Sequence, residues 1–120
     1  MPLHIDVNES KPGTARVALT GSLDSGTAPA LEERLAGIPD TVSLIVFDMK
    51  DLAYISSAGL RVIFATLKRQ KQKGGKVALG SMSAGVRKVF EIVRALPDMT
   101  VFSNAAEMDA YLAKFQKPED

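Results

Sequence analysis

The 120-residue sequence contains no cysteine, no tryptophan and only one histidine, His4. Without cysteine the chain can form no disulfide, no thiolate zinc site and no thiol nucleophile. His4 falls in an early strand pattern, where we expect a half-exposed strand residue rather than a general base, so a serine nucleophile would lack a histidine partner. The composition therefore predicts no catalytic residue, no metal site and no cofactor.

Long hydrophobic runs and a strong charge of either sign are also missing. The apolar run at residues 44–47 is far too short to cross a bilayer, and the N-terminus lacks the basic and apolar regions of a signal peptide. The net charge is +1, and the basic cluster at 68–73 ends a helical pattern without interleaved aromatic residues. We therefore expect a cytoplasmic monomer that binds neither nucleic acid nor membrane.

Strand and helix patterns alternate along the chain. Leu3, Ile5 and Val7 alternate with polar residues and, with a second strand at 15–19, predict an antiparallel edge hairpin. The run at 44–47 is apolar on both faces, which predicts a central strand covered by helices on each side of the sheet. Further helices are predicted around 28–36, 60–73, 86–96 and 108–115, and further strands at 76–79 and 101–102.

This alternation predicts one α/β domain at residues 1–116, followed by a short frayed tail at 117–120. The expected fold is a mixed, mostly parallel sheet of about five strands with an N-terminal antiparallel edge hairpin and about four helices. Binding sites of such sheets gather beyond the carboxyl ends of the strands. Three loops are therefore of interest, at 21–26, 48–57 and 80–83.

The loop at 48–57 ends in two adjacent serines, Ser56 and Ser57, where a helix must begin. One of them can be an ordinary N-cap, which accepts a hydrogen bond from a backbone N–H that has no partner within the helix. A phosphate on a serine here would carry about −1.5 to −2 charges and face a helix N-terminus, which stabilises anions. Spacing alone leaves both roles open.

Residues 51–60 closely resemble the signature of STAS domains of the anti-sigma factor antagonist type. Residues 21–24 resemble that family's G-x-[LI]-D motif, 74–76 its G-G-x start of a strand, and 83–96 the helix that follows. The four motifs occur in the family's order and span nearly the whole chain. The sequence is therefore identified as a member of this family, and the fold this implies agrees with the one expected from the patterns.

The resemblance puts Ser57 at the position of the family's regulatory phosphoserine. The preceding residue is usually aspartate and is Ser56 here, so Ser56 is the alternative phosphorylation site. Asp24 matches an aspartate that lies near that serine and contributes to the partner surface, with turn capping as its alternative role. The complete set of residues expected at the partner surface is Ser22, Asp24, Ser56, Ser57, Ala58, Gly59, Leu60 and Arg61.

Partner switching is the function that the resemblance implies. The unphosphorylated protein would bind an anti-sigma factor that is also a serine kinase of the histidine-kinase-like ATPase fold, and phosphorylation of Ser57 would end that binding. A metal-dependent serine phosphatase would restore it, so the chain would be a substrate of both enzymes and not an enzyme itself. The alternative is a STAS subunit or scaffold of a membrane transport or signalling assembly without a serine switch.

Two smaller expectations concern surface residues and helix ends. The helix after Ser57 is expected to present a docking surface beside the loop at 21–26. Its members would be the exposed residues Arg61, Thr66 and Arg69. Helix caps are expected at Ser83 and Ser103.

Overall fold

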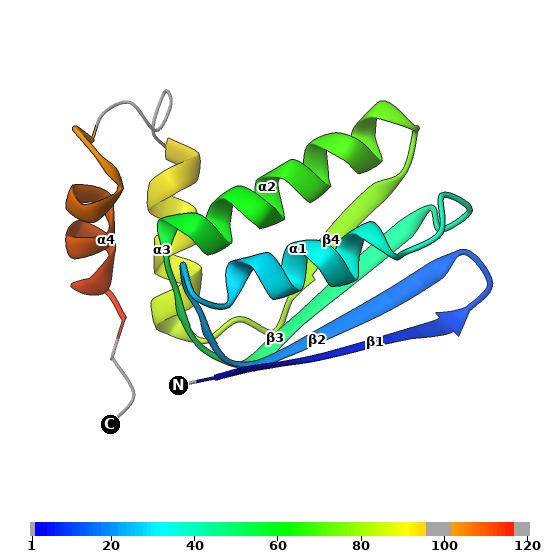
Figure 1. Ribbon diagram of the computed structural model, residues 1–120, viewed down its shortest axis with the longest axis horizontal. Helices are drawn as coiled ribbons and strands as arrows, with labels where there is room; N and C mark the ends of the chain where they lie inside the picture. Colours follow the sequence, from blue (N-terminus) through cyan, green and yellow to red (C-terminus); the bar gives the residue numbers. More distant parts are fainter. Residues whose placement is uncertain (1, 96–101, 117–120) are drawn as a thin grey trace.

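Four strands and four helices follow one another along the residues that the structure describes, 2–95 and 102–116 of a computed structural model (Figure 1). In chain order they are β1 (Leu3–Lys11), β2 (Thr14–Leu23), α1 (Ala28–Ala36), β3 (Leu44–Ile55), α2 (Ser57–Gln72), β4 (Lys76–Gly80), α3 (Ala84–Ala95) and α4 (Ala105–Ala113). Helix α1 has the bounds expected from the sequence, whereas β2 and β3 are longer than expected.

The strands form one sheet in the order β1-β2-β3-β4. β1 and β2 are antiparallel and joined by a tight turn in which Gly13 takes a φ of 82°, while β2, β3 and β4 are mutually parallel. The predicted mixed, mostly parallel sheet with an N-terminal antiparallel hairpin is thus confirmed. Part of the strand predicted at 101–102 lies outside the described residues, and Phe102, which is described, belongs to no strand.

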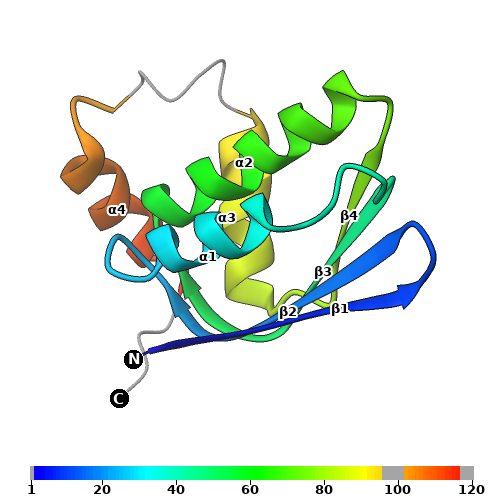
Figure 2. The ribbon, with the colours of Figure 1, turned by 45° about the vertical axis from the view of Figure 1, so that its right-hand side comes forward.

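One face of the sheet carries the apolar core. Val7, Val17, Phe47 and Leu79 lie in one row across the four strands, and Val17 and Phe47 are fully buried. Helices α1 and α2 lie over this face in both views (Figures 1 and 2). Burial of this continuous apolar layer is the main force that holds the helices on the sheet.

The prediction that helices cover both sides of residues 44–47 is wrong for the part of the chain described. Val46 points away from α1 and α2 and is only half-buried, beside an ion pair between Arg16 and Asp48. The backbone N–H of Lys50 and the Arg16 guanidinium outweigh burial and lower the pKa of Asp48. Aliphatic residues also occur on half-exposed strand faces, so the apolar run at 44–47 did not require a helix on each side of the sheet.

β3 continues to Ile55, well past Asp48, where the sequence predicted a loop. Its second half pairs with β2 as far as Leu23, through two register shifts. β4 stops opposite Asp48, and α3 packs against β3. Because β4 ends well before β3 does, the loop at 80–83 leaves the sheet short of the other two loops of interest.

The starts of α3 and α4 show how closely sequence signals locate a helix. Ser83 Oγ accepts the N–H of Val86 at 3.3 Å, which confirms the expected cap of α3. At α4, Asn104 is the cap in place of Ser103, because its Oδ1 accepts the N–H of Glu107 at 2.8 Å. Asparagine caps as well as serine, so two adjacent candidates left the position uncertain by one residue.

Candidate partner-binding site at the start of α2

β2 and β3 end side by side and bring two expected site loops together. Leu23 pairs with Ile55, and the N–H of Ser56 donates to the Leu23 carbonyl oxygen at 2.8 Å. The turn that leads into α1 and the first residues of α2 therefore leave the sheet next to each other. This is the carboxyl end of two adjacent parallel strands, where the sequence predicted a binding site.

Ser56 is the N-cap of α2. Its Oγ accepts the N–H of Gly59 at 3.4 Å, and its carbonyl oxygen accepts the N–H of Leu60 at 2.9 Å. Ser56 has extended backbone angles, φ −99° and ψ 175°, as an N-cap residue should. Of the two adjacent serines, the capping role thus belongs to Ser56, and Ser57 is the first residue of the helix proper.

Ser57 is covered by the last helix. Only 1% of it is exposed, and its N–H donates to Asp109 Oδ1 of α4 at 2.7 Å. Both views place α4 beside the start of α2 (Figures 1 and 2). The carboxylate of Asp109 therefore occupies the position at the helix N-terminus that favours an anion.

A second α4 contact holds the end of β3. Gln116 follows α4 and is 5% exposed; its Oε1 accepts the N–H of Ile55 at 2.7 Å, and its Nε2 donates to the Ile55 carbonyl at 2.9 Å. This side-chain amide supplies the two hydrogen bonds that a neighbouring strand would supply, at the edge that β4 leaves free. Sequence patterns marked neither Asp109 nor Gln116, since their partners are 52 and 61 residues away.

Asp24 organises the turn before α1. Its Oδ1 accepts the N–H groups of Gly26 at 2.9 Å and Thr27 at 3.2 Å, and its own N–H donates to Thr27 Oγ1 at 2.9 Å. The expected turn-capping role is confirmed. Asp24 is half-buried, so part of its carboxylate remains open to solvent.

The hydroxyl of Tyr54 connects these two regions electrostatically. Burial raises the pKa of Tyr54, and the negative charges of Asp109 and Asp24 raise it further. Both carboxylates therefore act on the same hydroxyl from different elements. The turn before α1 and helix α4 therefore each place a carboxylate close enough to Tyr54 to raise the pKa of its hydroxyl.

Most of the expected partner surface lies inside the fold. Gly59 and Leu60 are buried, because a Cβ at Gly59 would come within 2.5 Å of Leu23 Cγ and the helix must approach the strand this closely. Ala58 is half-buried and Arg61 is exposed. The buried members of the expected set are Ser22, Ser56, Ser57, Gly59 and Leu60, and the accessible ones are Asp24, Ala58 and Arg61.

The expected docking surface on α2 needs one correction. Thr66 is 3% exposed and its hydroxyl donates to the Val62 carbonyl at 2.9 Å, so it cannot form a surface. Arg61 and Arg69 are exposed, and Arg69 reaches the Leu35 carbonyl of α1 at 3.5 Å. Residue 66 faces inward because it lies three positions after Ile63 on the buried face of the helix.

The described residues offer neither a metal-binding cluster nor a membrane-spanning helix. Across 2–95 and 102–116, no group of three or more His, Cys, Asp or Glu side chains is arranged to hold a metal ion. Within those limits, no helix is both long and apolar enough to cross a membrane. His4, the histidine considered as a base, is exposed on β1.

The fold and site define a STAS domain. The model of the STAS domain family matches residues 7–108, and the chain belongs to this family, as its motifs predicted. It is 29% identical over 107 residues to the anti-sigma-B factor antagonist of Bacillus subtilis (strain 168), covering 89% of this chain and 96% of that protein. It is 32% identical over 95 residues to the anti-sigma-F factor antagonist RsfB of Mycobacterium tuberculosis (strain H37Rv), covering 72% and 78% respectively.

A solved structure supports the fold independently. The anti-sigma factor antagonist SpoIIAA in its unphosphorylated form superposes with a TM-score of 0.65 at 19% identity, over 74% of this chain and 83% of SpoIIAA. At 19% identity this similarity shows only that the two proteins share a fold. It agrees with the α/β architecture expected from the sequence.

Proposed function

We propose that this protein is an anti-sigma factor antagonist that works by phosphorylation-controlled partner switching. In its unphosphorylated form it binds an anti-sigma factor that is also a serine kinase of the histidine-kinase-like ATPase fold. Phosphorylation of Ser57 ends the binding, and a metal-dependent serine phosphatase restores it. The observation that carries the proposal is Ser57 as the first residue of α2, in a chain similar over most of its length to proteins named anti-sigma factor antagonists.

The position of Ser57 suits a phosphate. The helix dipole favours an anion at the start of α2, and a phosphate there would take the place that the Asp109 carboxylate occupies, once α4 moves away. Arg61 is exposed one turn further along the helix, at the spacing that brings side chains together. A partner surface that fits a neutral serine would instead face about two negative charges. Binding would then weaken by several kcal/mol unless a cation of the partner pairs with the phosphate.

Ser57 is a better phosphorylation site than Ser56. The Ser56 hydroxyl is the N-cap of α2, so a phosphate on it would remove the hydrogen bond to Gly59. Ser57 makes its hydrogen bond to α4 through its backbone N–H, so a phosphate on its hydroxyl would not directly remove that bond. Ser56 is the second candidate.

Access to Ser57 requires α4 to move. The contact of α4 with the site includes the hydrogen bond that Asp109 accepts from Ser57 and the two that Gln116 forms with Ile55. Opening also exposes Met108 and Leu112, which α4 buries in the core, so the open form is a minor, locally unfolded state of the domain. In this mechanism the kinase acts on the open form, and α4 sets how often that form occurs.

The deciding experiment measures binding and phosphorylation together. Wild type, Ser57→Ala, Ser57→Asp and the control Ser56→Ala are tested for binding to the kinase purified from the native cell, and the recovered chain is examined by mass spectrometry. We expect Ser57→Asp to lose binding, Ser57→Ala and Ser56→Ala to retain it, and phosphate to lie on Ser57 of the wild type. Phosphate found only on Ser56 would move the switch by one residue.

The burial of Ser57 favours one alternative. A STAS subunit or scaffold of a membrane transport or signalling assembly needs no accessible serine, and 1% exposure fits that role. Equal binding by all four variants, with no phosphate on either serine, would reject the switch and put this alternative first.

A further inference from the structure

The two edges of the sheet differ in how they are protected. β4 is only five residues long, begins with Lys76, and has Lys68 and Lys71 of α2 beside it. Lysine and short length are the usual means by which proteins prevent an edge from pairing with another strand. β1 is nine residues long and has neither lysine nor proline before Lys11. The β1 edge therefore lacks the short length and the lysines that protect β4.

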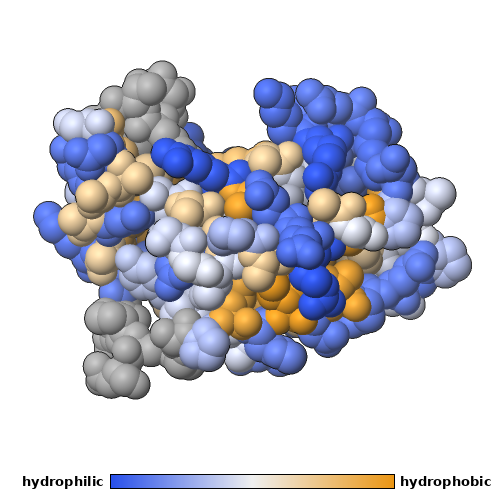
Figure 3. Space-filling view, in the orientation of Figure 1, coloured by the Kyte–Doolittle hydropathy of each residue, from blue (hydrophilic) through white to orange (hydrophobic). Residues whose placement is uncertain are grey.

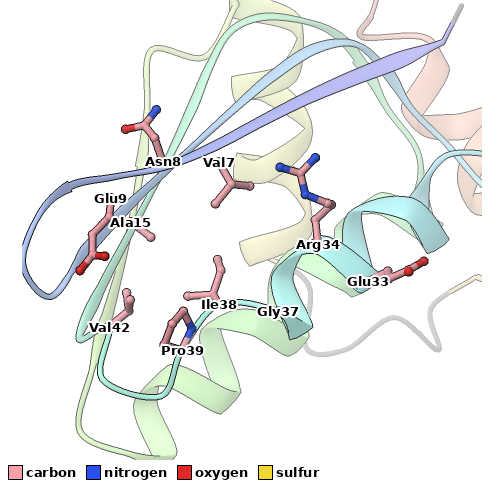
Figure 4. Close-up of a pocket in the computed structure, with 10 residues that line it drawn as sticks. All are labelled: Val7, Asn8, Glu9, Ala15, Glu33, Arg34, Gly37, Ile38, Pro39 and Val42. Carbon is pink, nitrogen blue, oxygen red and sulfur yellow. The ribbon is translucent and has the colours of Figure 1, made fainter.

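The side chains of β1 are incompletely covered. Leu3, Ile5 and Val7 face the same side as the core but are only half-buried. Figure 3 shows an apolar patch between α1 and β1, and a groove of about 390 Å³ lies there, with Val7, Ile38 and Arg34 around it (Figure 4). Helix α1 thus covers β2 more completely than β1.

The backbone of β1 is available for pairing at alternate residues. Arg34 Nη1 of α1 donates to the Ile5 carbonyl oxygen at 3.3 Å, so this carbonyl points away from β2. In an antiparallel pair the N–H and C=O of one residue point the same way and alternate along the strand. Leu3, Ile5 and Val7 therefore present both groups to the outside, while His4 and Asp6 bond to β2.

We propose that β1 pairs antiparallel with β1 of a second copy of this chain, centred on Ile5, so that one sheet continues through both copies. In this register Ile5 faces Ile5 of the second copy and Leu3 faces its Val7, which joins the half-buried apolar side chains. On the opposite face His4 lies across from Asp6 of the second copy, twice by symmetry. The chain then forms a weak dimer rather than the monomer expected from the sequence.

Other registers fit less well. Centring the pair on Asp6 places two carboxylates opposite each other, which is unfavourable. Centring it on Val7 places Ile5 opposite Glu9 of the second copy and leaves a charge against an apolar residue. The Ile5 register alone matches apolar with apolar and base with acid along the strand.

Arg34 shields this edge in the single chain. Its guanidinium occupies the Ile5 carbonyl that the second copy would use, and the side chain is exposed and can swing away. Arg34→Ala is therefore expected to strengthen dimerisation. The inference does not depend on the proposed function, because it concerns an edge that is separate from Ser57.

Sedimentation equilibrium over a range of protein concentrations tests the proposal through a charge swap. We expect the wild type to dimerise reversibly, and His4→Glu to raise the dissociation constant about fivefold or more, since it sets two carboxylate pairs across the interface. Asp6→Lys should also weaken the dimer, because it removes the acceptor that faces His4 of the second copy. The double variant His4→Glu/Asp6→Lys restores opposite charges and should regain dimerisation. Lys76→Glu, on the β4 edge, should change nothing.

Ile5→Pro provides a second test that is independent of charge. Proline removes the outward N–H at the centre of the pair without removing a bond to β2, so the monomer should keep its circular dichroism spectrum while dimerisation is lost. A wild type that stays monomeric at the highest concentration overturns the proposal. So does a double charge variant that is no better than the singles.

Discussion

Two helices begin side by side at the ends of β2 and β3, and they satisfy their first N–H groups in different ways. At α1, the N–H of Ala28 donates to the Asp24 carbonyl oxygen at 2.8 Å, and Asp24 Oδ1 accepts the N–H groups of Gly26 and Thr27 in the turn just before the helix. At α2, Ser56 provides a local cap, but the N–H of Ser57 depends on Asp109, 52 residues away. One start is built from neighbouring residues and the other is completed by a distant helix.

The difference shows which part of the site can change. The turn at Asp24 keeps its hydrogen bonds wherever α4 lies, because all of its partners lie within a few residues. The environment of Ser57 changes as soon as α4 opens, because Asp109 leaves with the helix. The site therefore combines a fixed acidic turn with a serine whose exposure depends on another element.

The largest effect is expected at the close approach of α2 to the sheet. In Gly59→Ala the new Cβ would lie 2.5 Å from Leu23 Cγ and 3.1 Å from Ile55 Cγ1, so the start of α2 must shift. We expect the free energy of unfolding to fall by about 1–3 kcal/mol. Urea denaturation measures this change.

Gly26→Ala is the matched control in the other helix start. Its Cβ would meet only Asp24 Oδ1, at 3.4 Å, in an exposed turn. We expect no loss of stability there. Equal destabilisation by both substitutions would mean that the two helix starts are packed alike, against the comparison above.

The second largest effect is expected on how often α4 opens and exposes residue 57. Because the chain has no cysteine, Ser57→Cys introduces a single thiol whose labelling rate reports the opening of α4. Adding Asp109→Ala or Gln116→Ala removes hydrogen bonds that hold α4. We expect labelling to become about tenfold faster in Asp109→Ala, since a bond to a charged group contributes about 1.5–3 kcal/mol, and to become faster by a smaller factor in Gln116→Ala. The measurement needs no kinase, so it separates the mobility of α4 from the proposed switch.

Two substitutions serve as controls for the labelling experiment. Glu107→Gln removes a charge from an exposed position on the same helix, and Asp24→Asn keeps an oxygen that can cap the neighbouring turn. Neither should change the labelling rate. Rapid labelling of Ser57→Cys in the otherwise unchanged chain would show that α4 does not cover this residue in solution.

The smallest expected effect is a change in the pKa of Tyr54 when the Asp109 charge is removed. In a Tyr111→Phe background Tyr54 is the only tyrosine, and its ultraviolet absorbance follows its ionisation. Because Asp109 helps to raise the pKa of Tyr54, Asp109→Asn should lower that pKa, and Glu107→Gln should not. An unchanged Tyr54 pKa in Asp109→Asn would place the carboxylate away from the hydroxyl.

The raised pKa of Tyr54 also predicts how the free energy of unfolding changes at high pH. Tyr54 ionises at a higher pH in the folded chain than in the unfolded chain, so above about pH 10 the unfolded chain loses its proton first. The free energy of unfolding should therefore fall as pH rises through this range. Tyr54→Phe should remove that part of the decline.

Local sequence patterns predicted some helix ends and strands correctly and misjudged others. The bounds of α1, the hairpin of β1 and β2 and the cap at Ser83 followed from local spacing, and the family followed from four motifs. The second half of β3 was mistaken for a loop, because Lys50 and Asp51 interrupt the apolar pattern at the edge where β4 has stopped. Thr66 was mistaken for a surface residue because threonine is common on both faces of helices.

The sequence by itself determined the alternation of strands and helices and the pair of serines at which α2 begins. These features depend on spacing within a few residues, where backbone geometry sets which side chains meet. Only the tertiary structure decided that helices cover one face of the sheet, that Asp109 accepts the N–H of Ser57 and that Gln116 fills the free edge at Ile55. Those contacts join residues 52 and 61 positions apart, and no local pattern encodes which distant side chain will reach an unpaired backbone group.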